Sequence, residues 1–214
     1  MQRFFKKPIA ALGVRTPDIR KIMKKTNPEG LSKQELIRVC EELLEMKKYE
    51  YAVVAFGWVY LARFKFNKKD FSIFERWLHK HVTNWGLCDT LSPYLLNDFL
   101  VRYPELMQNV RRWTRSKNNM VRRASAVVFL RDSGGVKPTL NDLKDVFWVA
   151  SALLGDEDDL VQKGCGWLLK NTSIKHQKEV FEFVMQHKHR IKRTALRYAI
   201  ERMPQELKVK ALSK

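Results

Sequence analysis

The sequence predicts an all-α fold, an α-solenoid of antiparallel helix pairs of the HEAT-like repeat type. Almost every segment of the 214 residues has apolar residues at helical spacing, and several segments begin with a helix-capping residue. No segment alternates apolar and polar residues between hairpin turns, as strands do. The expected helices recur in pairs about every 35–45 residues, the period of HEAT-like repeats.

The N-terminal helices are marked by their start signals. Thr16 is expected to cap a helix that has Pro17 in its first turn, and Ser32-Lys33-Gln34-Glu35 has the pattern of a capping box. Asp70 is expected to cap a later helix. The segment 49–66 is apolar nearly all round, which predicts a helix packed on several sides. The four expected ranges are 16–25, 32–44, 49–66 and 70–78.

The remaining helices follow one interrupted segment and one clear loop. Pro93 lies inside the helical segment 84–101, and proline removes a backbone donor, so we expect a kink or a new helix starting there. Gly134-Gly135 and Pro138 mark the loop, and Thr139 is expected to cap the helix after it. Further expected helices begin at Pro104 and cover 121–131, 139–154, 156–169, 175–186, 189–203 and 204–212.

Composition limits the class of protein. The 45% hydrophobic fraction argues against disorder, and no linker or low-complexity tract divides the chain, so we expect one domain over residues 1–214. No apolar run approaches the ~20 residues that span a bilayer. The three cysteines, Cys40, Cys88 and Cys165, lack CxxC spacing and indicate reduced thiols in a cytoplasmic protein, with neither a disulfide framework nor a zinc site.

Charge indicates the partner. The 41 Lys and Arg outnumber the 23 Asp and Glu along the whole chain, giving a formal net charge of +18. Such a field favours nucleic acid or an anionic membrane surface. The paired histidines around Lys80 and Lys188 are interpreted as further basic surface. We expect a basic concave face that follows DNA phosphates, with contacts from Arg111, Arg112, Lys117, Arg122, Arg123, Lys163, Arg190 and Arg193.

One group of residues suggests chemistry. Trp85 and Asp89 are four residues apart, so on a helix they share a face. Arg123 and Trp167 follow at intervals of about one repeat, and we expect all four on the first helices of successive pairs, facing one surface. Two indole faces hold a cationic base, a carboxylate stabilises an oxocarbenium ion, and an arginine anchors a phosphate. These roles suit hydrolysis of an N-glycosidic bond to a positively charged base.

These residues and several motifs resemble the AlkD-type DNA alkylation-repair glycosylases. The motifs are 12–17, 84–89, 104–106, Arg123-Ala124 and 162–167. The resemblance implies a HEAT-like protein without metal or organic cofactor, acting as a monomer on double-stranded DNA that contains N3- or N7-alkylated purines. It further implies that Asp89 is the catalytic carboxylate, that Trp85 and Trp167 contact the lesion nucleotide without flipping of the base into a pocket, and that Arg123 holds the backbone.

The chain departs from the family pattern at three positions. Phe4 stands where the family has a tyrosine, near an N-terminus that begins at about the family's second helix, which puts activity on bulky adducts in question. Gly86 and Cys88 replace common neighbours between Trp85 and Asp89.

Simpler interpretations of the four residues stay open. Tryptophans are often core residues, Asp89 is also suited to capping a helix, and a single arginine on a basic surface is unremarkable by itself. Two other functions are open as well: a non-catalytic protein that binds branched or distorted DNA, and a HEAT-like adaptor that binds an acidic protein.

Overall fold

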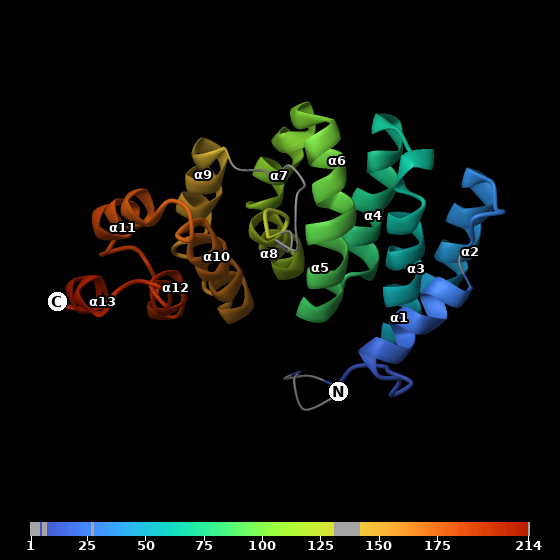
Figure 1. Cartoon of the computed structure of the whole chain (residues 1–214), viewed down its shortest axis with the longest axis horizontal. Coiled ribbons are helices and arrows are strands. Elements are labelled where there is room, and N and C mark those ends of the chain that lie inside the picture. Colours follow the sequence, from blue (N-terminus) through green and yellow to red (C-terminus); the bar gives the residue numbers. More distant parts are fainter. Residues whose placement is uncertain (1–4, 6–7, 27, 131–141, 214) are drawn as a thin grey trace. The chain divides into compact units, whose positions relative to one another are not determined.

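The computed structural model describes residues 5, 8–26, 28–130 and 142–213. This part of the protein consists of helices and the turns between them, and it contains no β-strand (Figure 1). The predicted all-α fold class is therefore confirmed. No helix in these ranges is both long and apolar enough to cross a membrane.

The chain divides into two compact units, Met1–Leu96 and Asn97–Lys214. The expected single domain over residues 1–214 stays a prediction. The first unit contains α1 (Thr16–Lys25), α2 (Lys33–Glu45), α3 (Tyr49–Leu61), the 3-10 helices Arg63–Lys65 and Lys68–Asp70, α4 (Phe71–His81), α5 (Trp85–Leu91) and the π-helical turn Ser92–Leu96. The second unit contains α6 (Asn97–Arg102), the 3-10 helix Pro104–Leu106, α7 (Met107–Trp113), α8 (Asn119–Val127), α9 (Leu143–Leu153), α10 (Asp159–Thr172), α11 (Gln177–Gln186), α12 (Arg193–Ala199) and α13 (Gln205–Leu212).

Helix α3 lies at the centre of the first unit and packs against α1, α2 and α5. Its apolar residues are buried on several sides, as its sequence predicted, and Phe56 stacks on Trp77 of α4 with ring centroids 6.3 Å apart. The helix ends at Leu61, so the expected range 49–66 was too long. Past Leu61 the burial pattern changes, because Phe64 is 75% exposed and only Phe66 returns to the core.

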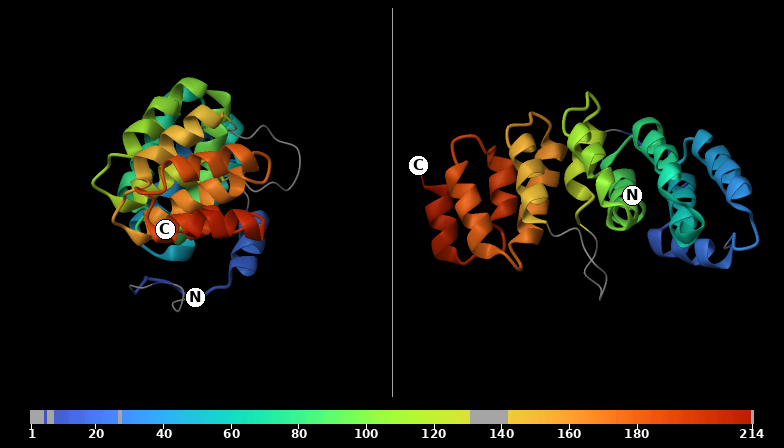
Figure 2. Two further views of the ribbon diagram at one scale, coloured as in Figure 1. Left: turned by 90° about the vertical axis from the view of Figure 1, so that its left-hand side faces the viewer. Right: turned by 90° about the horizontal axis from the view of Figure 1, so that it is seen from above.

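Helix α10 has the same central place in the second unit, where it packs against α8, α9 and α12. Helices α8, α10 and α12 lie side by side in one layer (Figures 1 and 2). The preceding helices α7 and α9 pack against α8 and α10 respectively and so complete two helix pairs. This stacking agrees with an α-solenoid, while the HEAT-like nature of the repeat stays an interpretation.

Two of the three predicted N-terminal caps need correction. The capping box is confirmed, because Ser32 Oγ accepts from Glu35 N at 3.2 Å and Glu35 Oε2 accepts from Ser32 N at 2.8 Å. Thr16 is instead the first helical residue, and the cap position is Arg15. Asp70 precedes α4 without capping it, since its carboxylate is engaged with the Lys33 ammonium at 3.0 Å and with the backbone N of Asn67 at 2.8 Å.

The segment around Pro93 continues as a helix with a local change of winding. A π-helical turn over Ser92–Leu96 joins α5 to α6, so no new α-helix starts at Pro93, and the alternative expectation, a kink at this position, stays a prediction. A π-turn accommodates the proline because it disrupts the regular i→i−4 hydrogen-bond pattern.

Several later helices are shorter or shifted. The expected helix 189–203 is reduced to α12, because residues before Arg193 and after Ala199 form turns. Helix α8 begins at Asn119 with Asn118 as its cap, and α9 begins at Leu143 with Asp142 as its cap. Thr139, the predicted cap of α9, and the loop 134–138 lie outside the described residues. Smaller shifts of two or three residues affect the ends of α10 and α11.

Candidate functional site

Helix α5 presents Trp85 and Asp89 on a half-buried face. Asn84 starts the helix, and its Oδ1 accepts from the backbone N of Leu87 at 3.0 Å. Leu87, Cys88 and Leu91 are buried in the core, whereas Trp85 and Asp89, one turn apart, are each partly exposed. Trp85 is therefore not a fully buried core residue, and Asp89 lies within α5, whose N-cap is Asn84.

Two aromatic rings adjoin this face. The ring of Phe5 stacks on Trp85 with centroids 5.0 Å apart and 22° between the planes, and it meets the edge of Tyr49 at 5.9 Å. Gly86 provides the space, because a Cβ atom there would lie 2.9 Å from Tyr49 Oη and 3.1 Å from Phe5 Cζ. Glycine at this position thus permits the close aromatic contact, and Phe4, the position discussed for the family tyrosine, lies outside the described residues.

The Tyr49 hydroxyl is held in its protonated form. Burial raises the pKa of Tyr49, and the negative charges of Asp89 and Glu50 raise this pKa further. The tyrosine is therefore a neutral hydrogen-bond donor close enough to sense the Asp89 charge.

Arg123 of α8 is nearly buried, at 5% exposure, so it is not a solvated surface arginine. Its Nη1 donates to the backbone O of Leu160, in the first turn of α10, at 2.6 Å. Gly164 gives it room, because a Cβ atom there would lie 3.3 Å from Arg123 Cγ. The arginine thus orders the start of α10 within the second unit.

Helix α10 presents Lys163 and Trp167 one turn apart, and both are partly exposed. Lys163 Nζ pairs with Asp159 Oδ2 at 2.8 Å, and this contact raises the pKa of Lys163, which therefore stays cationic. Gly166 allows α12 to approach, because a Cβ atom there would lie 2.7 Å from the backbone O of Ala195. Gly164 thus accommodates the Arg123 side chain, whereas Gly166 permits close approach of the backbones of α10 and α12.

The assignment of the site to first helices was wrong. Arg123 and Trp167 lie on α8 and α10, the second helices of the pairs α7–α8 and α9–α10, and Trp85 lies on α5, which follows α4. The two helices of the second unit do share a layer. The convergence of all four residues on one surface stays a prediction.

This chain is similar to a known protein family in sequence and to a solved structure in fold. The sequence profile described as "DNA alkylation repair enzyme" matches residues 1–203. The chain belongs to this family of DNA alkylation repair enzymes. A solved structure, a predicted DNA alkylation repair enzyme from Enterococcus faecalis, shares the fold with a TM-score of 0.73 at 15% identity, over 90% of this chain and 88% of that chain. No curated protein matches the sequence.

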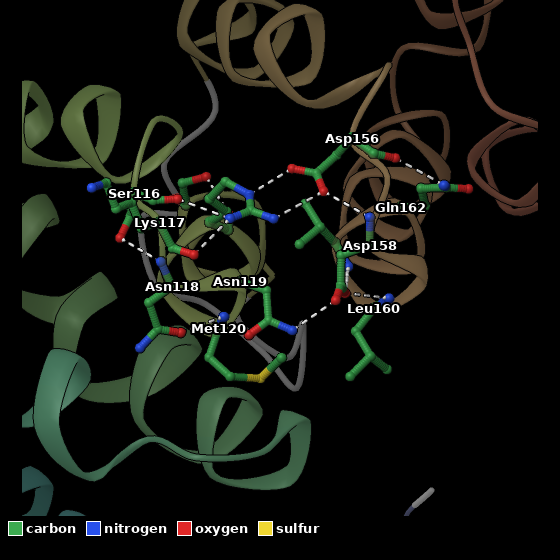
Figure 3. Close-up of polar contacts among 12 residues, drawn as sticks. Ser116, Lys117, Asn118, Asn119, Met120, Asp156, Asp158, Leu160 and Gln162 are labelled. Atoms are coloured by element: carbon green, nitrogen blue, oxygen red, sulfur yellow. Dashed lines mark hydrogen bonds and ion pairs between the residues drawn. The ribbon is translucent and has the colours of Figure 1, made fainter.

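Membership of the family gives this protein a role in repair of alkylated DNA. Its basic residues differ in whether their side chains are engaged in contacts within the protein. Arg122 is committed to a polar network that joins the turn before α8 to the turn before α10 (Figure 3). Its guanidinium contacts both carboxylate oxygens of Asp156, at 2.6 and 3.1 Å, and the backbone O of Ser116 at 2.8 Å. Asn119 and Asp158 extend the network with a hydrogen bond of 2.7 Å. Arg122 thus links the turns before α8 and α10 within the second unit.

The other basic residues of the repair protein differ in how far they are paired. Arg111 forms an ion pair with Asp145 at 2.8 Å and lies over the Trp148 ring at 5.4 Å, while Arg112 is exposed and donates to Asn109. Three further candidates have exposed side chains: Lys117, Arg190 and Arg193. Among the residues that the structure covers, no cluster of three or more His, Cys, Asp or Glu side chains is arranged to hold a metal ion.

Phe5 and Tyr49 were not among the predicted site residues. The sequence shows Tyr49 only as the start of an apolar helix and Phe5 only as part of a short basic stretch. Their contact with the Trp85 face joins segments far apart in sequence, and no local pattern indicates it.

Proposed function

We propose that this protein is a monofunctional DNA glycosylase that hydrolyses the N-glycosidic bond of positively charged N3- and N7-alkylated purines in duplex DNA. The observation that carries the proposal is the pairing of Trp85 and Asp89 on the partly exposed face of α5, whose other face is core. An aromatic plate and an anion on one face suit a cationic base attached to a sugar.

Asp89 is the proposed catalytic residue. When the bond between C1′ and the purine nitrogen breaks, its electron pair stays with the purine and neutralises the positive charge of the alkylated ring. The sugar becomes oxocarbenium-like, and a carboxylate stabilises that charge and orients the attacking water. The water oxygen bonds to C1′ and releases a proton, which leaves an abasic site. Because the leaving group is already cationic, little acid catalysis is needed.

Trp85 and Trp167 are the proposed contacts to the lesion nucleotide. Each indole is partly exposed on its own helix, and an indole face attracts a cation, by about 0.5–2 kcal/mol depending on desolvation. This contribution favours the cationic alkylpurine over an unmodified neutral base.

The proposed contacts to the DNA backbone come from the second unit. Arg123, oriented by its hydrogen bond to Leu160, is proposed to hold a phosphate near the lesion, with Lys163 beside it. The exposed residues Arg112, Lys117, Arg190 and Arg193 are proposed to contact further phosphates, and Arg111 does so in competition with its ion pair to Asp145. Arg122 stays in this set as a predicted phosphate contact, and its guanidinium also serves the network around Asp156.

The test is base release from duplex DNA that carries a single 7-methylguanine or 3-methyladenine, measured under single-turnover conditions. We expect free alkylpurine and an abasic site, and no release of unmodified guanine. A protein that releases nothing but binds branched DNA more tightly than duplex is a non-catalytic DNA-binding protein, and one with no DNA affinity is an adaptor. Either result overturns the proposal.

A further inference from the structure

Glu50 is a buried carboxylate to which the proposed reaction gives no role. It lies in the first turn of α3 at 3% exposure and accepts hydrogen bonds from three successive backbone N–H groups, those of Leu12 at 2.8 Å, Gly13 at 2.9 Å and Val14 at 3.2 Å. Successive N–H groups directed at one anion are a recognised way to compensate a buried negative charge.

The backbone at Gly13 is suited to this contact. Its φ of 86° is in the left-handed region, which glycine enters without steric cost. An exposed glutamate at the start of a helix is hydrated by water and needs no hydrogen-bond donor from the protein. Glu50 instead accepts from backbone groups 36–38 residues away in sequence. The burial of Glu50 under residues 12–14 therefore indicates that its role is to hold that segment.

The held segment leads to the candidate site. The backbone N of Tyr49, the neighbour of Glu50, donates to the backbone O of Ala10 at 2.8 Å, which fixes the segment at a second point. Nearer the N-terminus, the Phe5 ring lies on Trp85 and against the edge of Tyr49. The first turn of α3 thus fixes the backbone at Ala10 and at residues 12–14, and the ring of Phe5 covers a face of the proposed lesion contact.

We propose that Glu50 is a positioning residue for Trp85, acting through the backbone of residues 12–14 and the ring of Phe5. With Phe5 stacked on one face of the indole, a nucleotide has at most the other face available, and the ring is already oriented before DNA arrives. Ordering a side chain in advance lowers the free-energy cost of binding. This inference rests on the proposed glycosylase function for its consequence, although the contact itself does not.

The experiment compares Glu50→Gln, Phe5→Ala and the double variant with the wild type. Glutamine keeps the size of Glu50 but loses the charge that the three N–H groups solvate. Phe5→Ala removes the ring and leaves the buried carboxylate in place, so it stays informative even where Glu50→Gln folds poorly. Asp70→Asn is the matched control, because Asp70 is another buried carboxylate of the first unit, paired with Lys33 and remote in sequence from the held segment.

Two readouts separate the positioning role from a loss of stability. The first is acrylamide quenching of Trp85 fluorescence, obtained for each protein as the difference from its Trp85→Phe form because the chain has six tryptophans. The second is the dependence of single-turnover base release on DNA concentration, which separates the half-saturating concentration from the maximal rate.

We expect quenching of Trp85 to increase in Glu50→Gln and Phe5→Ala and to stay unchanged in Asp70→Asn. The half-saturating DNA concentration should rise about two- to tenfold, the range that one aromatic pair contributes, with the maximal rate changed by less than about threefold. The double variant should match the larger single effect, because both changes interrupt one chain of contacts.

Three results would overturn the inference: unchanged Trp85 quenching in Glu50→Gln, effects that multiply in the double variant, or the same changes in Asp70→Asn. A wild type that releases no base defeats the proposed function alone, because the quenching measurement still decides whether Glu50 holds Phe5 on Trp85.

Discussion

In each unit, glycines allow neighbouring groups to pack closely against the helix that carries a candidate tryptophan, but the charged residue four positions from that tryptophan is acidic in one unit and basic in the other. In the first unit Gly86 of α5 lets aromatic rings approach the helix, and the resulting face carries Trp85 and an acid four residues later. In the second unit two glycines of α10 admit Arg123 and α12, and that face carries a lysine four residues before Trp167.

The difference suggests a division of labour. An aromatic ring with an anion suits the charge that develops on the sugar, whereas an aromatic ring with a cation suits the DNA backbone. The first unit is thus expected to control the rate of bond cleavage, and the second to control how DNA is held. Changes confined to one unit test this division.

Asp89→Asn should have the largest effect. Loss of the carboxylate removes the group proposed to stabilise the transition state, so single-turnover base release should fall by roughly 10²–10³-fold, with DNA affinity kept or raised because a negative charge near the phosphates is lost. Asp18→Asn is the control, since Asp18 is an acid of the same unit in a surface ion pair with Arg15 at 2.9 Å. Comparable loss in both variants, or weaker DNA binding by Asp89→Asn, would contradict the catalytic role.

Asp156→Asn should act on the stability of the second unit. The Asp156 side chain is 9% exposed and that of Arg122 is 20% exposed, so neutralising the acid leaves a largely buried guanidinium without its counterion. We expect a loss of about 3 kcal/mol in the free energy of unfolding, measured by urea denaturation. Glu157→Gln, which removes the adjacent but 86% exposed partner of Lys192, should cost less than about 1 kcal/mol. Equal costs would show that the network around Arg122 is not structural.

Gly166→Ala should test the close contact between α10 and α12. The added Cβ atom would lie 2.7 Å from the backbone O of Ala195 and 2.5 Å from Tyr198 Cβ, so the helices must separate, at a cost of about 1–3 kcal/mol by urea denaturation. Gly155→Ala is the control, since no atom lies within 4 Å of a Cβ atom there. If Gly166→Ala is as stable as Gly155→Ala, the close packing of these helices is not needed.

The sequence predicted local features well and long-range ones poorly, for a physical reason. The capping box of Ser32 and Glu35 lies within four residues, so its pattern is visible in the sequence and was confirmed. The sequence shows the charge of Arg122 but not its partner Asp156, which lies 34 residues away, so the ion pair between them was missed, while the predicted DNA contact of Arg122 stays a prediction. Glu50 was missed for the same reason, since its three N–H partners lie 36–38 residues away.

Prediction of the candidate site from the sequence was limited in the same way. The spacing of Trp85 and Asp89 predicts that they share a helix face, because that relation depends only on helical geometry. Burial decides which face is presented, and burial depends on the whole fold. The histidines illustrate this: His79 and His81 were both interpreted as basic surface, but only His79 is exposed, while the His81 side chain is 9% exposed and lies 3.8 Å from Glu45.

Acidification should have the smallest effect, and it should act through His81 in the first unit. Burial lowers the pKa of His81 below its ordinary value of 6.5, and the charges of Lys80 and Arg76 lower it further, while Glu45 and Glu41 oppose the shift. Above pH 6.5 the histidine is neutral in both the folded and unfolded states, so it does not make the free energy of unfolding depend on pH there. As pH falls below 6.5, the unfolded chain binds the proton first, and stability decreases until pH passes the folded pKa.

The measurement is the urea midpoint from about pH 7.5 to about pH 5 for the wild type, His81→Gln and His79→Gln. His81→Gln should lose part of the acid-dependent decrease, whatever its stability at neutral pH, because glutamine does not titrate. His79→Gln should keep the wild-type slope, since that side chain is exposed. Parallel curves for the wild type and His81→Gln would show that another group carries the acid sensitivity. A smaller slope in His81→Gln alone would assign that sensitivity to the contact between α2 and α4, and so to the first unit.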